Sequence, residues 1–344
     1  MARATRRDVA ALAGTSVAVV SYVVNGGPRT VAAGTRQRVL DAIEQTGYRP
    51  NRAAAALAGG TAHTIGLIVP DVSNPFFAEL AHMVEDEVFA CDRVLLLGDC
   101  SNDPERERII ARNLWEHNVD GLLYVGSRPD AVLAPFLEDQ VPVVLLDRVP
   151  ADSAMLGVGI DHVAAARSAT AHLAEHGYRE IGLLAGPPDV ITAEERRRGW
   201  EQALGDAGLV VDEAWVVAAE YSRRAGYAAA LELLGRPRRP RAVFAANDRQ
   251  ALGATHAAAR LGLTIPRDLA LFTIDGTEDA EFAVPSISTV QQPLREIAGT
   301  GVALLLGRLP MAERRWYCEF TMAYRQSCGC EPSEPWPAQG GAKS

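Results

Sequence analysis

The chain has 344 residues, of which 48% are hydrophobic and 22% charged, and its formal net charge is −9. The length favours two or three domains, and the composition is that of an ordinary globular protein. No apolar run approaches the roughly 20 residues of a membrane-spanning helix, and five cysteines, an odd number, do not form a disulfide framework. The first residues also lack the apolar stretch of a secretory leader. We therefore expect a soluble, cytoplasmic protein with no membrane partner.

The charge is divided unevenly along the chain. The first sixty residues carry eight arginines against three acidic residues, a net charge of +5, whereas the remainder carries 26 basic and 40 acidic residues, a net charge of −14. Only the N-terminal part is therefore suited to a polyanion such as nucleic acid. A charge excess of this size also arises from coding bias. Charge alone therefore does not identify a nucleic-acid-binding module, and the sequence motifs have to distinguish the two explanations.

Two short helices joined by a glycine are predicted at the start of the chain. The first begins near Arg6 and is broken at Gly14, and Ser16 can cap a second over residues 17–24. A third helix is predicted over residues 35–47, and the expected core positions are Val9, Ala10, Leu12, Ala13, Val20, Val23, Val24, Val39, Ala42 and Ile43. This is the spacing of a helix-turn-helix, although helical pairs with a glycine turn also occur in proteins that never touch DNA.

Strand-like and helical patterns alternate after a short linking segment. Asn51 can cap a short Ala-rich helix that would be marginal alone. From His63 onward, strands are predicted over residues 64–70, 94–99, 120–126, 142–147, 155–161, 180–185, 215–220, 241–246, 269–275 and 286–291. This alternation predicts βαβ units in two doubly wound, parallel-sheet lobes, whose ligands bind at the carboxyl ends of the strands. The Pro- and Gly-rich residues 331–344 are expected to be disordered.

Several stretches then make a resemblance specific. "DVAALAGTSVAVVSYVVNG", "TRQRVLDAIEQTGYRPN" and "IGLIVPDVSNPFFAEL" are similar to the opening of a LacI-family transcriptional regulator, and the likeness continues through residues 142–148, 172–187, 244–254 and 289–293. The resemblance implies an all-α headpiece over residues 1–60 with a hinge helix at about 51–58, and a two-lobed core over 61–330 like that of periplasmic sugar-binding proteins. It also implies a homodimeric repressor of a pseudo-palindromic DNA operator, controlled by a small effector.

The same resemblance implies which residues meet DNA. These are Ser16, Val17, Ala18, Ser21, Tyr22 and Asn25 in the second helix, and Ala54, Leu57 and Ala58 in the hinge. Many family members have arginine where this chain has Tyr22, so guanine selection should be weaker there. The residue matching Leu57 wedges into the minor groove at the operator centre. The alternatives are a Tyr22 ring packed on the third helix, Val17 and Ala18 as surface filling, and a linker helix with Leu57 packed on its dimer partner.

For the effector, the resemblance implies contacts at Phe76, Phe77, Asp147, Arg196, Tyr221, Asn247, Asp275 and Gln291. Carboxylate, amide and guanidinium groups with aromatic faces are typical of a carbohydrate site. The stretch "FTIDG" departs from the family's usual Gly-aromatic-Asp-Asp pattern, because Gly276 stands where an acidic residue is usual. Asp275 and Asn247 could alternatively cap strand–helix loops.

Other motifs are weaker. His172 and His176 fit the HxxEH pattern of inverted zinc peptidases, but a catalytic zinc needs a third ligand and an open cleft, and this helix is expected to pack on a sheet with Leu173 inward. Cys328 and Cys330 lack a second Cys/His pair and are expected to end the final strand. We expect no metal site, no cofactor and no catalytic residues.

Three classes of protein are therefore compared. A transport-type binding protein would need a signal peptide and no headpiece, and an enzyme would need a catalytic constellation, whereas a transcriptional regulator accounts for both parts of the chain. The sequence leaves open the effector, the operator, whether the ligand releases or promotes DNA binding, and the choice between a dimer and a higher oligomer.

Overall fold

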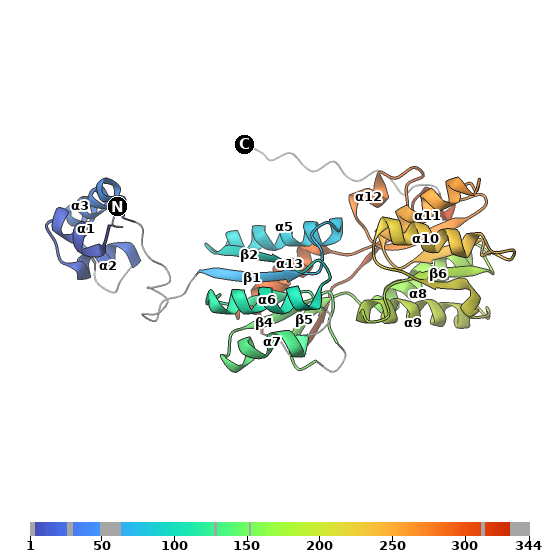
Figure 1. Ribbon diagram of the computed structural model, residues 1–344, viewed down its shortest axis with the longest axis horizontal. Coiled ribbons are helices and arrows are strands. Elements are labelled where there is room, and N and C mark those ends of the chain that lie inside the picture. Colours follow the sequence, from blue (N-terminus) through green and yellow to red (C-terminus); the bar gives the residue numbers. More distant parts are fainter. Residues whose placement is uncertain are drawn as a thin grey trace. The chain divides into compact units, whose positions relative to one another are not determined.

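The computed structural model describes residues 4–25, 30–48, 63–126, 129–150, 153–310 and 314–330, and it divides into a unit of residues 1–62 and a unit of residues 63–344. The predicted hinge helix with Ala54, Leu57 and Ala58, the side chain of Asn25 and the predicted disordered tail lie outside the described residues. Each unit is described by itself below (Figure 1).

The described residues of the first unit form three helices, α1 (Arg6–Leu12), α2 (Val17–Asn25) and α3 (Ala33–Thr46). Gly14 has a φ of +60°, the left-handed conformation that glycine adopts at no steric cost, and this turns the chain between α1 and α2. The Ser16 hydroxyl oxygen accepts a hydrogen bond from the Val19 backbone N–H at 3.3 Å, so the predicted cap is confirmed.

The core of this unit matches the prediction except at one position. Val9, Ala10, Val20 and Val39 are buried, whereas Leu12 is 53% exposed. The prediction for Leu12 was wrong because Val9, Ala10 and Ala13 already define the inward face of α1, and Leu12 lies more than a quarter of a turn away from it. The third helix also begins two residues earlier than predicted.

The second unit contains two lobes, each built on a six-stranded sheet. In the N-terminal lobe the strand order is β11-β5-β4-β3-β1-β2, and in the C-terminal lobe it is β12-β10-β9-β8-β6-β7. The strands of the N-terminal lobe are β1 (Thr64–Val69), β2 (Val94–Asp99), β3 (Leu122–Tyr124), β4 (Val143–Leu146), β5 (Leu156–Gly159) and β11 (Arg315–Tyr317). Those of the C-terminal lobe are β6 (Ile181–Ala185), β7 (Val216–Ala218), β8 (Ala242–Ala245), β9 (Ala270–Asp275), β10 (Ser288–Gln291) and β12 (Thr321–Ala323).

Helices cover both faces of each sheet (Figure 1). In the N-terminal lobe, α5 (Pro75–Phe89) packs with α13 (Leu294–Leu305), and α6 (Pro104–Glu116) packs with α7 (Pro129–Glu138). In the C-terminal lobe, α8 (His162–Glu175) packs with α9 (Ile191–Asp206), and α10 (Arg223–Leu234) packs with α11 (Asp248–Arg260). Three short elements complete the unit, α12 (Glu278–Glu281), η1 (Glu213–Trp215) and η2 (Gln326–Cys328).

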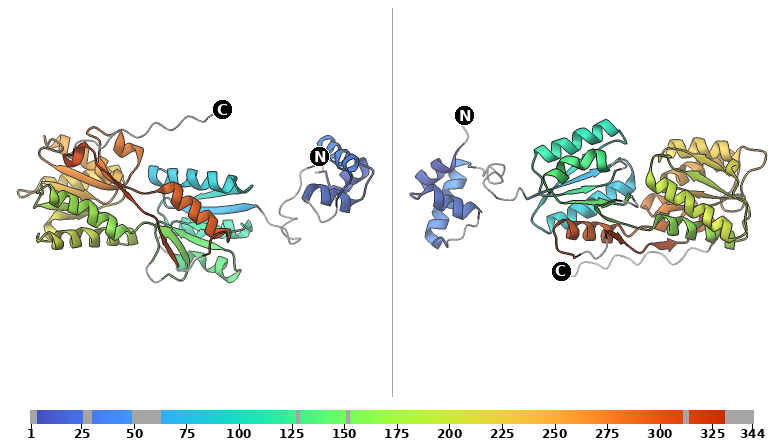
Figure 2. Two further views of the ribbon diagram at one scale, coloured as in Figure 1. Left: turned by 180° about the vertical axis from the view of Figure 1, so that it is seen from behind. Right: turned by 90° about the horizontal axis from the view of Figure 1, so that it is seen from below.

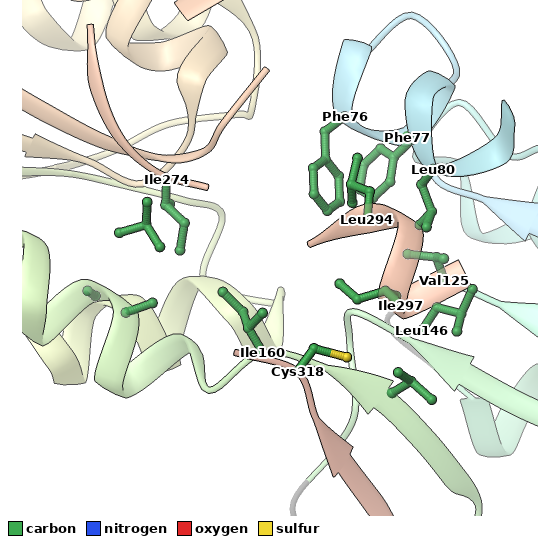
Figure 3. Close-up of a cluster of buried hydrophobic side chains, with 14 of the residues drawn as sticks. Phe76, Phe77, Leu80, Val125, Leu146, Ile160, Ile274, Leu294, Ile297 and Cys318 are labelled. Carbon is green, nitrogen blue, oxygen red and sulfur yellow. The ribbon is translucent and has the colours of Figure 1, made fainter. Parts of the chain in front are cut away.

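The chain passes between the lobes in three segments, residues 160–161, 292–293 and 318–320. The second of these leads from β10 into α13, as the views of Figure 2 show. Ile160 and Cys318, from the first and third segments, are buried in the same apolar cluster as Phe76, Phe77 and Leu294 (Figure 3). The connections are therefore packed into the core beside the lobe boundary.

All ten predicted strands are present, with ends that differ by at most two residues. The sequence reasoning missed β11 and β12, which have three residues each, too few for a periodic pattern to be visible. The expectation that Cys328 and Cys330 end the final strand was wrong. The chain turns after β12, and Cys328 lies in η2.

Candidate functional site

The candidate site lies where the carboxyl ends of the parallel strands of both lobes meet. A cavity there is lined by Asn74, Phe76, Phe77, Asp147, Arg148, Thr192, Arg196, Tyr221, Asn247 and Asp275. Seven of the eight residues predicted to contact an effector are in this set, and all but Arg196, which lies in the second turn of α9, end or follow a strand or open the next helix. The strand-end rule for ligands of doubly wound sheets therefore explains why residues so distant in sequence converge.

Two aspartates occupy corresponding places in the two lobes. Asp147 follows β4 and Asp275 ends β9, and β4 and β9 have the same position in the two strand orders. Both have positive φ, +60° at Asp147 and +136° at Asp275. A side chain other than glycine rarely adopts such a conformation, and residues held there concentrate at functional sites. Both carboxyl groups are buried.

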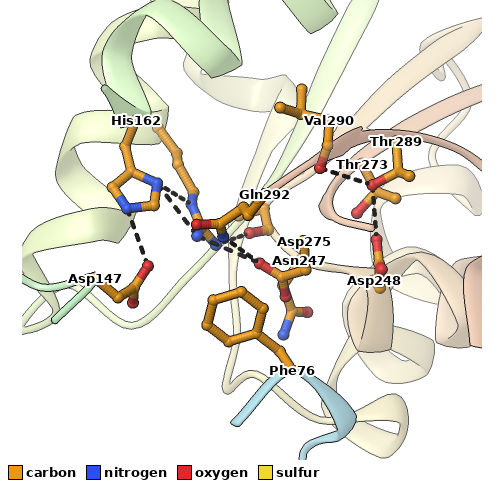
Figure 4. Close-up of polar contacts among 12 residues, drawn as sticks. Phe76, Asp147, His162, Asn247, Asp248, Thr273, Asp275, Thr289, Val290 and Gln292 are labelled. Atoms are coloured by element: carbon orange, nitrogen blue, oxygen red, sulfur yellow. Dashed lines mark hydrogen bonds and ion pairs between the residues drawn. The ribbon is translucent and has the colours of Figure 1, made fainter. Parts of the chain in front are cut away.

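A chain of polar contacts joins these aspartates (Figure 4). His162 Nε2 lies 3.2 Å from Asp147 Oδ1, and His162 Nδ1 accepts from Arg196 Nε at 3.4 Å. The Arg196 guanidinium also lies 3.5 Å from Asp275 Oδ1 and donates to the Ala246 carbonyl. The contact between His162 Nε2 and Asp147 Oδ1 is one of proximity and charge, because neither atom has a hydrogen-bond partner of good geometry among the described residues. The network thus links a carboxylate of one lobe to an arginine of the other.

The surroundings shift the pKa values of the two carboxyl groups in opposite directions. Burial raises the pKa of Asp147, but the contact with His162 and the charge of Arg196 outweigh burial, so this pKa lies below its usual value. Burial raises the pKa of Asp275 well above its usual value. Arg196 offsets only part of that increase, and the negative charge of Asp248 adds to it. Both carboxyl groups can accept hydrogen bonds from the hydroxyl groups of a ligand, and the surroundings favour the charged form of Asp147 more than that of Asp275.

Aromatic faces cover the N-terminal-lobe side of the cavity. Asn74 caps α5 by accepting from the Phe76 backbone N–H at 3.3 Å, and the rings of Phe76 and Phe77 meet edge to face with centroids 5.1 Å apart. The Arg148 guanidinium lies 5.6 Å from the centre of the Phe77 ring, and that of Arg196 lies 5.9 Å from the centre of the Tyr221 ring. Cation–π contacts thus orient Arg148 and Arg196 against aromatic rings.

Gln291 is the one predicted effector residue that does not line this cavity. Its neighbour Gln292 is buried and donates from Nε2 to Asp275 Oδ1 at 3.2 Å. Within the described residues, no hydrogen-bond partner reaches Gln292 Oε1. Gln291 instead lies against Gly276, where an added Cβ would come within 2.6 Å of the Gln291 Cα atom. A side chain at position 276 would clash with Gln291, which explains why this chain has glycine where the family usually has an acidic residue.

Sequence reasoning did not single out Asn74, Arg148 and Thr192. Each is adjacent to, or within four residues of, a residue that was predicted, which is the signal that could have found them. The alternative for Asn247 holds in part, because its side-chain oxygen caps α11 by accepting from the Gln250 backbone N–H at 2.9 Å. Asp248 accepts from both the backbone and the hydroxyl of Thr277, at 2.7 and 2.8 Å, and so anchors the loop that follows Asp275.

The N-terminal unit presents a second candidate surface on α2. Val17 is 42% exposed and Ala18 is also exposed, whereas Ser21 and Tyr22 are half-buried. Val20 and Val23 point into the core of the unit. Val17, Ala18, Ser21 and Tyr22 therefore lie on the other sides of α2. No single described helix is long and apolar enough to cross a membrane, and α1 and α2 meet that test only as a pair bent by 105°.

Comparisons with known proteins agree with this division. Residues 5–51 match the family model described as bacterial regulatory proteins, lacI family, and residues 170–328 match a periplasmic binding protein-like domain. Catabolite control protein A of Priestia megaterium is 33% identical over 300 residues, which cover 87% of this chain and 90% of that protein.

Two solved structures have the same fold. The transcriptional regulator CelR–cellobiose complex matches with a TM-score of 0.71 and 31% identity, covering 94% of this chain and 100% of that one. The lac repressor dimer bound to operator and the anti-inducer ONPF matches with a TM-score of 0.85 and 26% identity, covering 95% of this chain and 99% of that one.

A helix-turn-helix unit and a two-lobed ligand-binding core define a DNA-binding transcriptional regulator. The chain belongs to the LacI family of bacterial regulatory proteins. The expected fold class is confirmed.

Proposed function

We propose that this protein is a repressor that binds a pseudo-palindromic operator as a homodimer, and that a small carbohydrate bound between the lobes controls its affinity for DNA. The observation that carries the proposal is the cavity at the strand ends, where Asp147, Arg196 and Asp275 converge beside two phenylalanine rings. Charged and amide groups can bind neighbouring hydroxyls while aromatic faces cover C–H surfaces. The relative in complex with cellobiose supports this ligand class.

Ligand entry requires that some contacts across the cavity be replaced. The pair His162 and Asp147 joins the two lobes, and so does the ion pair of Arg249 Nη1 with Asp71 Oδ2 at 2.8 Å. A ligand that binds one spacing of the lobes better than another shifts the balance between these spacings. We propose that the spacing is passed to the DNA-binding units through residues 51–58, which form a helix only when the dimer holds two copies together.

On the DNA side, we propose that α2 enters the major groove. Val17 and Ala18 then contact thymine methyl groups, Tyr22 contacts a base edge, and Ser16 and Ser21 contact phosphates. Leu57 is proposed to wedge into the minor groove, and Leu57→Ala should weaken specific binding by about 1–3 kcal/mol with a smaller DNA bend. Unchanged affinity and bend would favour a plain linker helix.

The test begins with selection of preferred duplexes by the full-length protein from a random pool. Operator binding is then titrated at fixed salt with cellobiose first, followed by other mono- and disaccharides. A ligand should change operator affinity by roughly 5–150-fold. Arg196→Ala and Asp275→Ala should lose this response while keeping ligand-free operator binding.

Arg197→Ala is the matched control, because Arg197 follows Arg196 on α9 and pairs with Glu201 at 2.8 Å on the surface. It should respond like the parent. If Arg196→Ala and Asp275→Ala also respond like the parent, the cavity is not the effector site. If selection yields no preferred duplex, sequence-specific DNA binding is contradicted.

A further inference from the structure

Four side chains with metal-binding atoms meet at the C-terminal end of α8. His172 Nε2 lies 3.4 Å from Cys328 Sγ and 3.5 Å from Cys330 Sγ, and His176 Nε2 lies 3.2 Å from Cys330 Sγ. One ligand atom each of His172, His176 and Cys330 lies within 4.8 Å of the others. The two histidines are four residues apart and so share one face of the helix. The two cysteines reach this face from a segment more than 150 residues later.

The separations fit a tetrahedral ion. With Zn–S of about 2.3 Å and Zn–N of about 2.0–2.1 Å, a nitrogen and a sulfur ligand at the tetrahedral angle are about 3.6 Å apart. The three observed N···S distances, 3.2 to 3.5 Å, are close to this edge length. Cys328 Sγ lies outside the group of ligand atoms that are all within 4.8 Å of one another, so the Cys328 side chain must move toward the other three to complete the set.

Local backbone and packing hold the ligands in place. Gly329, between the two cysteines, has a φ of +94°, which turns the chain so that both sulfur atoms face α8. The His172 ring packs on the Phe272 ring at 5.4 Å and on the Tyr324 ring at 4.6 Å between centroids. These contacts orient the imidazole before any ion binds, so the cluster is preorganised.

We propose that His172, His176, Cys328 and Cys330 form a structural site for Zn²⁺ that fastens residues 326–330 to the end of α8. Two thiolates and two imidazoles are a complete tetrahedral ligand set for this ion, and no position stays open for a substrate. The site differs from a zinc-peptidase site for that reason. Its Cys-x-Cys spacing is shorter than the usual C-x₂₋₄-C, and Gly329 compensates through its left-handed turn.

The experiment uses the full-length chain without an affinity tag, purified under reducing conditions without chelator. Bound zinc is measured by elemental analysis, then removed, and the apo protein is titrated with Co²⁺ alone. We expect one Co²⁺ per chain, with a thiolate-to-cobalt charge-transfer band and the intense visible bands of tetrahedral cobalt, and loss of these bands on adding Zn²⁺. Cys330→Ser and His176→Ala should each weaken binding at least about tenfold.

The controls separate this cluster from other metal-binding groups. Cys91→Ser and His117→Ala change residues outside the cluster and should leave the titration unchanged. The exposed group of His82, Glu85 and Asp86 has no sulfur ligand, so cobalt bound there would give no charge-transfer band. Charge-transfer bands that persist in Cys328→Ser/Cys330→Ser, no such band in the parent, or a Cys328–Cys330 disulfide in the freshly reduced protein would overturn the proposal.

Discussion

The two ends of α8 both place histidines among charged or sulfur-bearing partners, but the partners come from different parts of the molecule. At the N-terminal end, His162 lies 3.2 Å from Asp147 of the other lobe. At the C-terminal end, His172 lies 3.4 Å from Cys328, which belongs to the same lobe as α8. Contacts at the first end can change when the lobes move, whereas contacts at the second end lie within one lobe and are independent of the spacing of the lobes.

One helix therefore serves two kinds of site. We call the N-terminal end of α8, at His162, the adaptable end, and its C-terminal end, at His172, the fixed end. The N-terminal end carries a network whose members are strained or imperfectly paired, as the positive φ of Asp147 and the unpartnered Gln292 Oε1 among the described residues show. The C-terminal end packs His172 between two aromatic rings. We expect perturbations at one end to have little effect at the other, because the groups are far apart and share no partner.

The largest expected effect concerns the fixed end. Zn²⁺ at a free concentration of 1,000 times its Kd should raise the free energy of unfolding by about 4 kcal/mol. The measurement is thermal and urea unfolding with zinc and with chelator. Cys328→Ser should abolish the difference and Arg196→Ala should preserve it. A loss of the zinc effect in Arg196→Ala would show that the two ends are not independent.

A smaller loss is expected when the contact across the lobes is removed. His162→Ala leaves the buried Asp147 carboxylate without its histidine partner, and we expect the free energy of unfolding to fall by about 3 kcal/mol. Urea unfolding followed by the fluorescence of the buried Trp200 gives the value. His117→Ala, at an exposed position, should change it by no more than about 0.5 kcal/mol. Equal losses in the two variants would mean that the lobe contact contributes nothing.

The third prediction concerns the pH dependence of the free energy of unfolding. It tests Asp248, a buried carboxyl group of the C-terminal lobe. Burial raises the pKa of Asp248 from 3.8 to about 6. A raised folded-state pKa of a carboxyl group contributes stability that is present below pH 3.8 and is lost as the pH rises to about 6. The loss should be on the order of 1–3 kcal/mol, and Asp248→Asn should remove it. The free energy of unfolding is measured between pH 3.8 and about 6 for the parent and for Asp248→Asn. If its pH dependence is the same in the two proteins, Asp248 does not titrate in this range.

The smallest expected difference is between two adjacent glutamines. Gln292→Ala removes the hydrogen bond to Asp275 and should lower the free energy of unfolding by about 0.5–1.5 kcal/mol. Gln291→Ala should cost less, because no side-chain hydrogen bond of Gln291 is found within the described residues. Both are measured by urea unfolding of the full chain. The reverse order would show that the hydrogen bond from Gln292 to Asp275 contributes less to stability than the contacts of Gln291.

Much of the fold was predictable because its signals are local. Most of the ten predicted strands are apolar runs bounded by turn residues, and the glycine and serine between α1 and α2 report the conformation of the residues next to them. Leu12 was misplaced because its face of α1 depends on where the helix meets α2 and α3, which the spacing of apolar residues leaves ambiguous.

The sequence by itself determined the three N-terminal helices, the alternation of strands and helices, and the residue types at the strand ends, because periodicity and the strand-end rule act within short segments. Tertiary structure decided which neighbours complete each site. The end of β10 places the side chain of Gln292 against Asp275, while Gln291 lies against Gly276. The return of the chain through β12 brings Cys328 and Cys330 to His172 and His176. Residues so distant in the chain meet only because the packing of whole elements lowers the free energy of one arrangement, and no local pattern reports that choice.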